Sequence, residues 1–301
     1  MVRGFTRTDL AALVAVGGVL GAVGVSLSHA DPSGRTERLI ESLANLRAQG
    51  VAIGQYRADN AGKLPLELTT TRRRPPANDQ GVTGWAVWQY GGKNCSAFWF
   101  NYSAGCFDVE AADRPLNAYL YPDFTFFAPP PPARLAVNDP ARMSQQARVF
   151  RDSADVNGRQ RNWPSLNNPP ISSYDDVGTS YGAQMDWMEQ LEGRVPGGLV
   201  GAFREGCRRL AVDQGVDPSR FLHIVDPIGD VVIYAGNPLF QTPGNHGGVN
   251  QGVSLYADGH AALITYRPGM QRAAKINAEY SVWFEDLGRP AGRTPEVQGD
   301  R

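Results

Sequence analysis

The longest apolar stretch of the chain lies near its N-terminus, where Leu10 to Ser28 contain no charged residue. A helix needs about 20 mostly apolar residues to cross a bilayer, so residues 5–30 are predicted to form one membrane-spanning helix. Arg3 and Arg7 lie at its N-terminal side. Because basic flanking residues stay in the cytoplasm, we expect the rest of the chain to lie outside.

A second helix is predicted within residues 31–65, separated from the first by a break near Pro32, since proline cannot continue a helix. Its apolar residues recur at helical spacing on one face, which indicates an amphipathic helix that covers a sheet. We expect it to end near Asn60-Ala61-Gly62, a turn signal. The apolar positions are Leu39, Leu43, Leu46 and Ile53.

Residues 66–268 are predicted to form a β-rich domain, and residues 269–301 a polar, frayed tail. The clearest signal is the alternation of Val253 to Tyr266 around Asp258-Gly259, which predicts a hairpin with a type I′ turn. The fold class expected is therefore α+β, a long N-terminal helix packed on an antiparallel sheet. Further strands are expected at Trp85–Tyr90, Phe221–Val225 and Asp230–Tyr234, and a helix at Leu199–Leu210.

Composition narrows the function classes. The 301 residues carry a net charge of -1, so no basic excess indicates nucleic-acid binding. Of the three cysteines, Cys95 and Cys106 flank an aromatic loop and could form a disulfide in an oxidising compartment, whereas Cys207 is expected to be a buried thiol. Their spacing matches no zinc site, and no metal or other cofactor is expected.

The only polar cluster worth testing comprises His246, Asp258 and His260, with His223 a further candidate. Together these side chains could take a metal at the tip of the hairpin. The alternative is architectural, because turn geometry alone explains Asp258-Gly259 and His246 can bond a backbone carbonyl. No phosphate loop or nucleophile elbow is present. We therefore expect no catalytic residue and no enzymatic activity.

The N-terminus carries a more specific signal. A short basic leader, then Gly4-Phe5-Thr6, then Asp9-Leu10 and an apolar helix, resembles the class III signal of type IV prepilins and type II secretion pseudopilins. The resemblance implies that a prepilin peptidase cuts after Gly4 and that Phe5 becomes the methylated N-terminal residue. Asp9 then stands where the family carries Glu, whose carboxylate neutralises the new amine of a neighbouring subunit. Two apolar family positions are replaced, by Arg7 and Thr8.

Further segments resemble prepilin-like families of the planctomycete type. Asn45 to Pro65 is similar to their segment after the membrane helix, and Arg114 to Leu120 to their Arg-Pro-Leu-Asn segment. His246 followed by Asp258-Gly259 resembles their motif of His, nine residues and Asp-Gly, with eleven residues here. The resemblance covers about the first 65 residues and scattered motifs as far as residue 266.

The resemblance implies a structural pilin-like or pseudopilin-like subunit. Its partners would be the prepilin peptidase and other such subunits, with single-pass insertion in the inner membrane before assembly into a filament. Two alternatives remain. Residues 1–30 could be an ordinary secretory signal cut between Ala30 and Asp31, or an uncleaved anchor. Either would leave an extracytoplasmic binding or hydrolytic domain.

Overall fold

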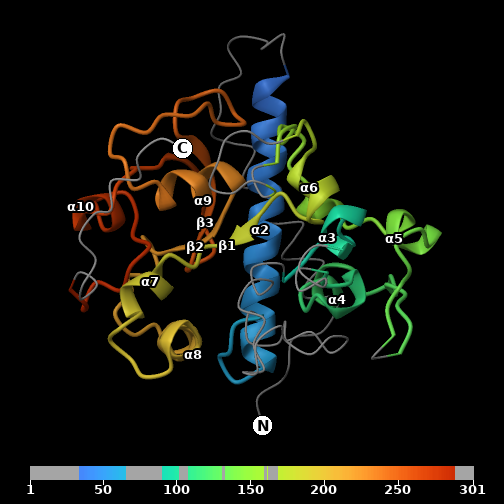
Figure 1. The fold of residues 1–301 in the computed structure, drawn as a ribbon, viewed down its shortest axis with the longest axis horizontal. Helices are drawn as coiled ribbons and strands as arrows, with labels where there is room; N and C mark the ends of the chain where they lie inside the picture. The colour runs from blue at the N-terminus through green and yellow to red at the C-terminus, as the bar shows by residue number, and fades with distance from the viewer. Residues whose placement is uncertain are drawn as a thin grey trace. The chain divides into compact units, whose positions relative to one another are not determined.

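The computed structural model describes residues 34–65, 90–101, 108–130, 133–158, 161 and 169–288 (Figure 1). The chain divides into two compact units, Met1–Thr36 and Glu37–Arg301. Within the first unit only residues 34–36 are described. The predicted leader, membrane helix and break near Pro32 therefore lie outside the described residues, as do Gly4, Phe5 and Asp9.

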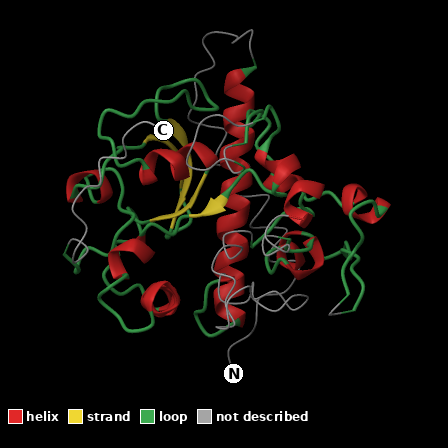
Figure 2. Cartoon of the chain, in the orientation of Figure 1, coloured by secondary structure: helices red, strands yellow, loops and turns green. Residues whose placement is uncertain are grey.

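Short helices outnumber strands in the described part of the chain (Figure 2). The strands are β1 (Gly182–Ala183), β2 (Leu222–Val225), β3 (Gln251–Tyr256) and β4 (Ala261–Thr265). The helices are α2 (Arg35–Asp59), α3 (Ala97–Asn101), α4 (Asn117–Leu120), α5 (Pro140–Ser144), α6 (Ser173–Asp176), α7 (Trp187–Leu191), α8 (Gly198–Ala211), α9 (Pro227–Tyr234) and α10 (Arg272–Lys275), with 3₁₀ turns at Ala111–Asp113 and Arg148–Phe150.

Helix α2 is the predicted amphipathic helix. Leu46, Ile53 and Tyr56 recur at helical spacing and are buried. The helix ends as expected, because the side-chain amide of Asn60 donates to the Tyr56 carbonyl at 2.8 Å and Gly62 takes a positive φ of 80°. The sequence prediction of this helix is confirmed for residues 35–59.

The four strands form one antiparallel sheet in the order β1-β2-β3-β4. Strands β3 and β4 are the predicted hairpin, in register from Gln251 opposite Thr265 to Leu255 opposite Ala261. The α+β expectation of a long helix packed on an antiparallel sheet is confirmed.

Both faces of this sheet are covered by other parts of the chain. Alternate residues of a strand point to opposite faces, so the strands contribute to two separate core clusters. On one face, Val253 and Leu255 of β3 join the core cluster that contains Leu46 and Ile53 of α2. On the other face, the strands contribute to a second cluster with α9 and the C-terminal segment. The members of this second cluster include Leu222, Val225, Ile228, Val232, Tyr256, Ile264, Tyr266, Tyr280, Val282 and Trp283.

Two predictions of local structure were wrong. Asp230–Tyr234 belongs to helix α9, because Asp226 caps it by accepting the Gly229 N–H at 2.8 Å and Pro227 occupies its first turn. The polar tail expected from residue 269 is instead folded as far as residue 288, with Trp283 and Phe284 fully buried. The predicted helix at Leu199–Leu210 and strand at Phe221–Val225 are confirmed as α8 and β2.

The predicted strand Trp85–Tyr90 and the predicted membrane helix fall wholly or mostly outside the described residues. Residues 85–89 of the predicted strand Trp85–Tyr90 lie outside the described residues, and Tyr90 itself belongs to no strand. Among the helices of the described ranges, none combines the length and the apolar character needed to cross a membrane.

Candidate functional site

The predicted cluster of His246, Asp258 and His260 is not brought together. His246 bonds instead to Asp152, with 2.9 Å between Nε2 and Oδ2, and both side chains are fully excluded from solvent. His260 bonds to Asp258 at the surface, with 2.6 Å between Nδ1 and Oδ1. The His260 ring also stacks on Tyr256 at 3.9 Å between ring centroids. The expectation that His246 bonds a backbone carbonyl was therefore wrong.

Helix α2 positions the segment that carries Asp152. The side-chain amides of Asn45 and Gln49 donate to the carbonyls of Arg151 and Val149, at 3.0 and 2.9 Å. Asp152 also accepts the backbone N–H of Ala154 at 2.8 Å. These bonds connect residues about 100 positions apart, so local sequence patterns could not predict the pairing of Asp152 with His246.

Two further buried carboxyl groups, those of Asp155 and Asp226, interact electrostatically with Asp152. Burial raises the pKa of Asp155 from 3.8 to about 7, and the charge of Asp152 adds to the rise. Burial likewise raises the pKa of Asp226 to about 7, again with a contribution from Asp152. The Asp155 carboxylate accepts bonds from Ser180 Oγ and the Ser173 N–H, each at 2.8 Å.

This buried network lacks the access that catalysis requires. A general base must reach the proton that it removes from a substrate, and neither His246 nor Asp152 has exposed side-chain surface. In the part of the chain that the structure describes, no three or more His, Cys, Asp or Glu side chains are grouped so that they could hold a metal ion. We interpret the network as a polar connection between α2, the Asp152 segment and the sheet.

The hairpin turn differs from the prediction. A type I′ turn needs positive φ at Asp258 and Gly259, but only Gly259 has one, at 92°. The Tyr256 carbonyl accepts the Gly259 N–H at 3.0 Å, and the His260 carbonyl accepts the Tyr256 N–H at 2.9 Å. The loop therefore has three residues, Ala257 to Gly259, and ends in a left-handed glycine.

Hydrogen bonds from the loop to a neighbouring segment of the chain explain why the turn has three residues. The N–H groups of Ala257 and Asp258 donate to the carbonyls of Phe221 and Pro218, at 2.9 and 3.1 Å. These bonds hold the loop against the segment before β2. The Asp258 side chain accepts the His260 N–H at 3.1 Å, as expected for an aspartate that shapes a turn.

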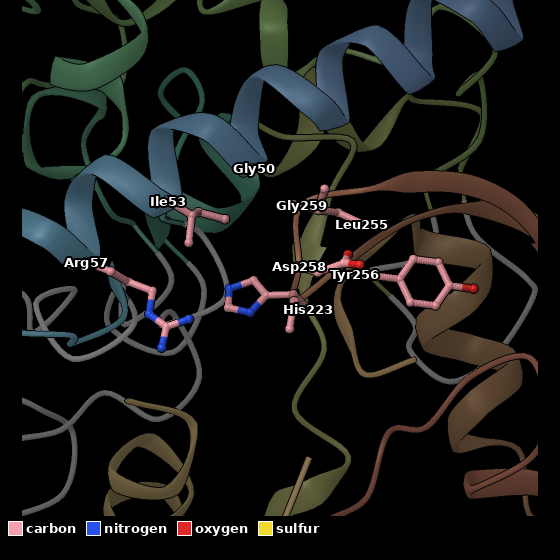
Figure 3. A pocket seen from close by; sticks show the side chains of 10 residues that line it. Gly50, Ile53, Arg57, His223, Leu255, Tyr256, Asp258 and Gly259 are labelled. Atoms are coloured by element: carbon pink, nitrogen blue, oxygen red, sulfur yellow. The ribbon is translucent and has the colours of Figure 1, made fainter. Parts of the chain in front are cut away.

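A small pocket lies between α2 and this turn (Figure 3). Its volume of about 110 Å³ is below the range of roughly 300–1,000 Å³ typical of drug-sized ligands. Two glycines one helical turn apart in α2, Gly50 and Gly54, are the sequence signal that could have indicated the pocket, because glycines leave one face of a helix without side chains. The lining residues are Gly50, Ile53, Gly54, Arg57, His223, Leu255, Tyr256, Ala257, Asp258 and Gly259.

Two polar residues of this pocket lie close enough to interact. Burial and, as a smaller effect, the charge of Arg57 lower the pKa of His223 from 6.5 to about 4. The imidazole is therefore neutral at pH 7. Arg57 donates through Nη2 to the carbonyls of Leu210 and Ala211 and to Asp213 Oδ1, each at 3.3 Å.

The predicted disulfide between Cys95 and Cys106 includes a residue that the structure does not describe. Cys95 is a buried free thiol whose Sγ donates to Asp108 Oδ1 at 2.9 Å, while Cys106 lies outside the described residues. Asp108 also pairs with buried Arg142 at 2.6 Å, so this region is held by ionic bonds. Cys207 is a buried thiol, as expected.

Residues of the Arg-Pro-Leu-Asn segment connect separate loops. The buried guanidinium of Arg114 donates to the carbonyls of Gly91 and Val177, both at 2.9 Å. The Asn117 side chain accepts the Gly92 N–H at 2.9 Å and donates to the Gly92 carbonyl at 2.7 Å. Their role in the structure is to satisfy buried backbone groups.

The chain was compared with protein families, curated proteins and solved structures. No protein-family model matches the chain, and no curated protein or solved structure matches it.

Proposed function

We propose that the protein is a structural pilin-like or pseudopilin-like subunit. The observation that carries the proposal is the packing on the antiparallel sheet of a helix, α2, that six residues separate from a charge-free run of membrane length at Leu10 to Ser28. In such a subunit the N-terminal helix would serve insertion and assembly. The sheet would support the folded domain.

Close packing of α2 on the hairpin supports this reading. A Cβ atom added at Gly50 would lie 3.1 Å from Leu255 Cδ1 and 3.2 Å from the Gly259 carbonyl oxygen. Gly50 and Gly259 belong to two of the segments that resemble prepilin-like proteins. Their contact gives these segments a shared structural role, to hold the helix and the hairpin together.

The proposal includes the partners and the location. A prepilin peptidase would process the chain between Gly4 and Phe5, and the protein would wait in the inner membrane with its folded domain outside. It would then assemble with other pilin or pseudopilin subunits. We propose no enzymatic activity, because the side chain of His246 is hydrogen-bonded to Asp152 and has no surface exposed to solvent.

Mass spectrometry of the mature N-terminus tests the proposal. We expect a chain that begins at methylated Phe5, and Gly4→Leu should remain unprocessed while Arg3→Gln serves as a control in the same leader. A mature chain that begins at Asp31 would contradict the proposal and favour the secreted binding or hydrolytic domain. If the mature chain begins at Phe5, negative-stain electron microscopy of cells that produce the protein would show whether processed chains enter filaments.

A further inference from the structure

We propose that the pocket between α2 and the β3–β4 turn binds a small carboxylate, held by Arg57 and His223 (Figure 3). This inference goes beyond the proposed function and does not depend on it. It rests on a buried polar atom, on the open helix surface beside that atom, and on the hydrogen-bond donors that face the pocket.

The buried polar atom is Nε2 of His223. The side chain is 7% exposed and lines the pocket, yet Nε2 has no hydrogen-bond partner among the described residues. Figure 3 shows the imidazole extending from β2 toward Arg57. Native structures rarely leave such an atom unsatisfied, so a group that enters the pocket is the natural partner.

Helix α2 leaves space for such a group. A Cβ atom added at Gly54 would meet no atom within 4 Å, whereas one added at Gly50 would touch Leu255 and Gly259. The helix therefore contacts the hairpin at Gly50 and leaves the surface beside Gly54 open. A volume of about 110 Å³ is enough for a few water molecules or for an acid of two or three carbons.

The donors favour an anion with two oxygens. The three hydrogen bonds that Arg57 makes to described residues all use Nη2, which leaves Nε and Nη1 for a ligand. Neutral His223 can donate through Nε2–H in one tautomer. One carboxylate oxygen would accept from the guanidinium and the other from the imidazole, in charge-assisted bonds.

The remaining walls limit the size and charge of the ligand. Ile53, Leu255 and Ala257 are apolar and suit a short aliphatic chain. Among the described residues that line the pocket, Arg57 is the single cation, and it already faces Asp213 and shares the lining with the Asp258 carboxylate, so a phosphate dianion would be poorly compensated. The Asp258 carboxylate is engaged by His260, and the Tyr256 ring points away from the site (Figure 3).

A carboxylate can come from two sources with the same chemistry. One is a free short-chain acid such as propionate. The other is the carboxylate of an Asp or Glu side chain on a second copy of the chain. The two differ in concentration dependence, since only the second responds to the concentration of the protein itself.

Nuclear magnetic resonance of the full-length chain, labelled with ¹⁵N at histidine, tests the proposal. The chain contains four histidines, so the signals are few. Propionate should shift the His223 signal saturably and leave those of His246 and His260 unchanged. In the absence of propionate, a His223 shift that grows with protein concentration would identify a second copy as the source.

Three variants make the test specific. Gly54→Leu should abolish the propionate response by filling the pocket, without the clash that Gly50 would suffer. Arg57→Gln should weaken propionate binding by about tenfold or more, the usual loss for one charge-assisted bond. Arg47→Gln, at an exposed position on the same helix, should leave binding unchanged.

The proposal is overturned if propionate and protein concentration both leave the His223 signal unmoved, which would mean that the pocket holds water only. It is also overturned if Gly54→Leu, with an unchanged melting temperature, still binds propionate with the parent affinity. Should Gly54→Leu fail to fold, unchanged binding in folded Arg57→Gln would contradict the proposal equally.

Discussion

The Nε2 atom of His246 lies 2.9 Å from Oδ2 of Asp152, and neither side chain has any surface exposed to solvent. Loss of one of the two side chains therefore leaves a buried polar atom of the other without its hydrogen-bond partner. His246 and Asp152 are 94 residues apart, so the bond also joins the β3 entry loop to the segment beneath α2.

The first prediction concerns this pair. His246→Ala should lower the free energy of unfolding by roughly 1–3 kcal/mol, because Asp152 Oδ2 would remain buried without its hydrogen-bond partner. Urea denaturation of the two proteins measures the difference. The control is His260→Ala, where the exposed pair with Asp258 should contribute less than about 1 kcal/mol. Equal losses in the two variants would contradict this account.

The second prediction concerns pH. Asp155 and Asp226 have pKa values of about 7 in the fold, against 3.8 ordinarily, so the folded state holds their protons more tightly than the unfolded state. Their contribution to stability is complete below pH 4 and is lost as pH rises to about 7. The stability of Asp155→Asn relative to the parent should therefore increase from pH 5 to pH 7, by up to ~1.4 kcal/mol per pH unit.

Urea denaturation at several pH values tests this, and Asp226→Asn should behave in the same way. His223 acts with the opposite sign, because its pKa of about 4 in the fold lies below 6.5. Its contribution is complete above pH 6.5 and is lost as pH falls toward 4. A constant difference between Asp155→Asn and the parent would show that the Asp155 carboxyl is not protonated in the fold.

The third prediction separates backbone strain from steric clash in the hairpin. Gly259 has a φ of 92°, yet a Cβ atom there would meet nothing within 4 Å. Gly259→Ala should therefore destabilise through backbone conformation alone, by roughly 1–3 kcal/mol. Gly236→Ala is the matched control, with open space and no positive φ. Thermal melts would contradict the argument if both changes were neutral.

The fourth prediction compares two glycines of α2. Gly54→Ala should raise the free energy of unfolding by up to about 1 kcal/mol, because alanine favours a helix and the added Cβ meets no neighbour. Gly50→Ala should gain less or lose stability, because its Cβ would lie 3.1 Å from Leu255 Cδ1. Chemical denaturation of the two variants measures this difference. A larger gain in stability from Gly50→Ala than from Gly54→Ala would contradict a close contact between the helix and the hairpin at Gly50.

The fifth prediction follows from the proposed function and concerns Asp9. A carboxylate in apolar surroundings needs a cationic partner, and the amine of processed Phe5 on a neighbouring subunit would supply one. Asp9→Ala should leave the chain inserted and its domain folded, but unable to enter filaments. Membrane fractionation, limited proteolysis and electron microscopy measure the three properties separately. Normal filaments from Asp9→Ala would refute the pairing.

Local patterns in the sequence determined the elements whose signals are complete within a short segment. The spacing of Leu46 and Ile53, with the turn at Asn60 to Gly62, was enough to place α2, because helical periodicity and capping act within a few residues. Alternation around Asp258-Gly259 placed the hairpin for the same reason. The helix α9 was missed although its signal, Asp226 before Pro227, was local and readable.

Tertiary structure decided the features that depend on distant groups. The turn at Asp258 took three residues because Phe221 and Pro218 accept its N–H groups. His246 paired with Asp152 rather than with the hairpin because α2 holds the Arg151 carbonyl in place. Residues around Trp283 became core because they cover the sheet face opposite α2. Each outcome depends on which segments pack together, and that information is carried by the whole chain rather than by any short part of it.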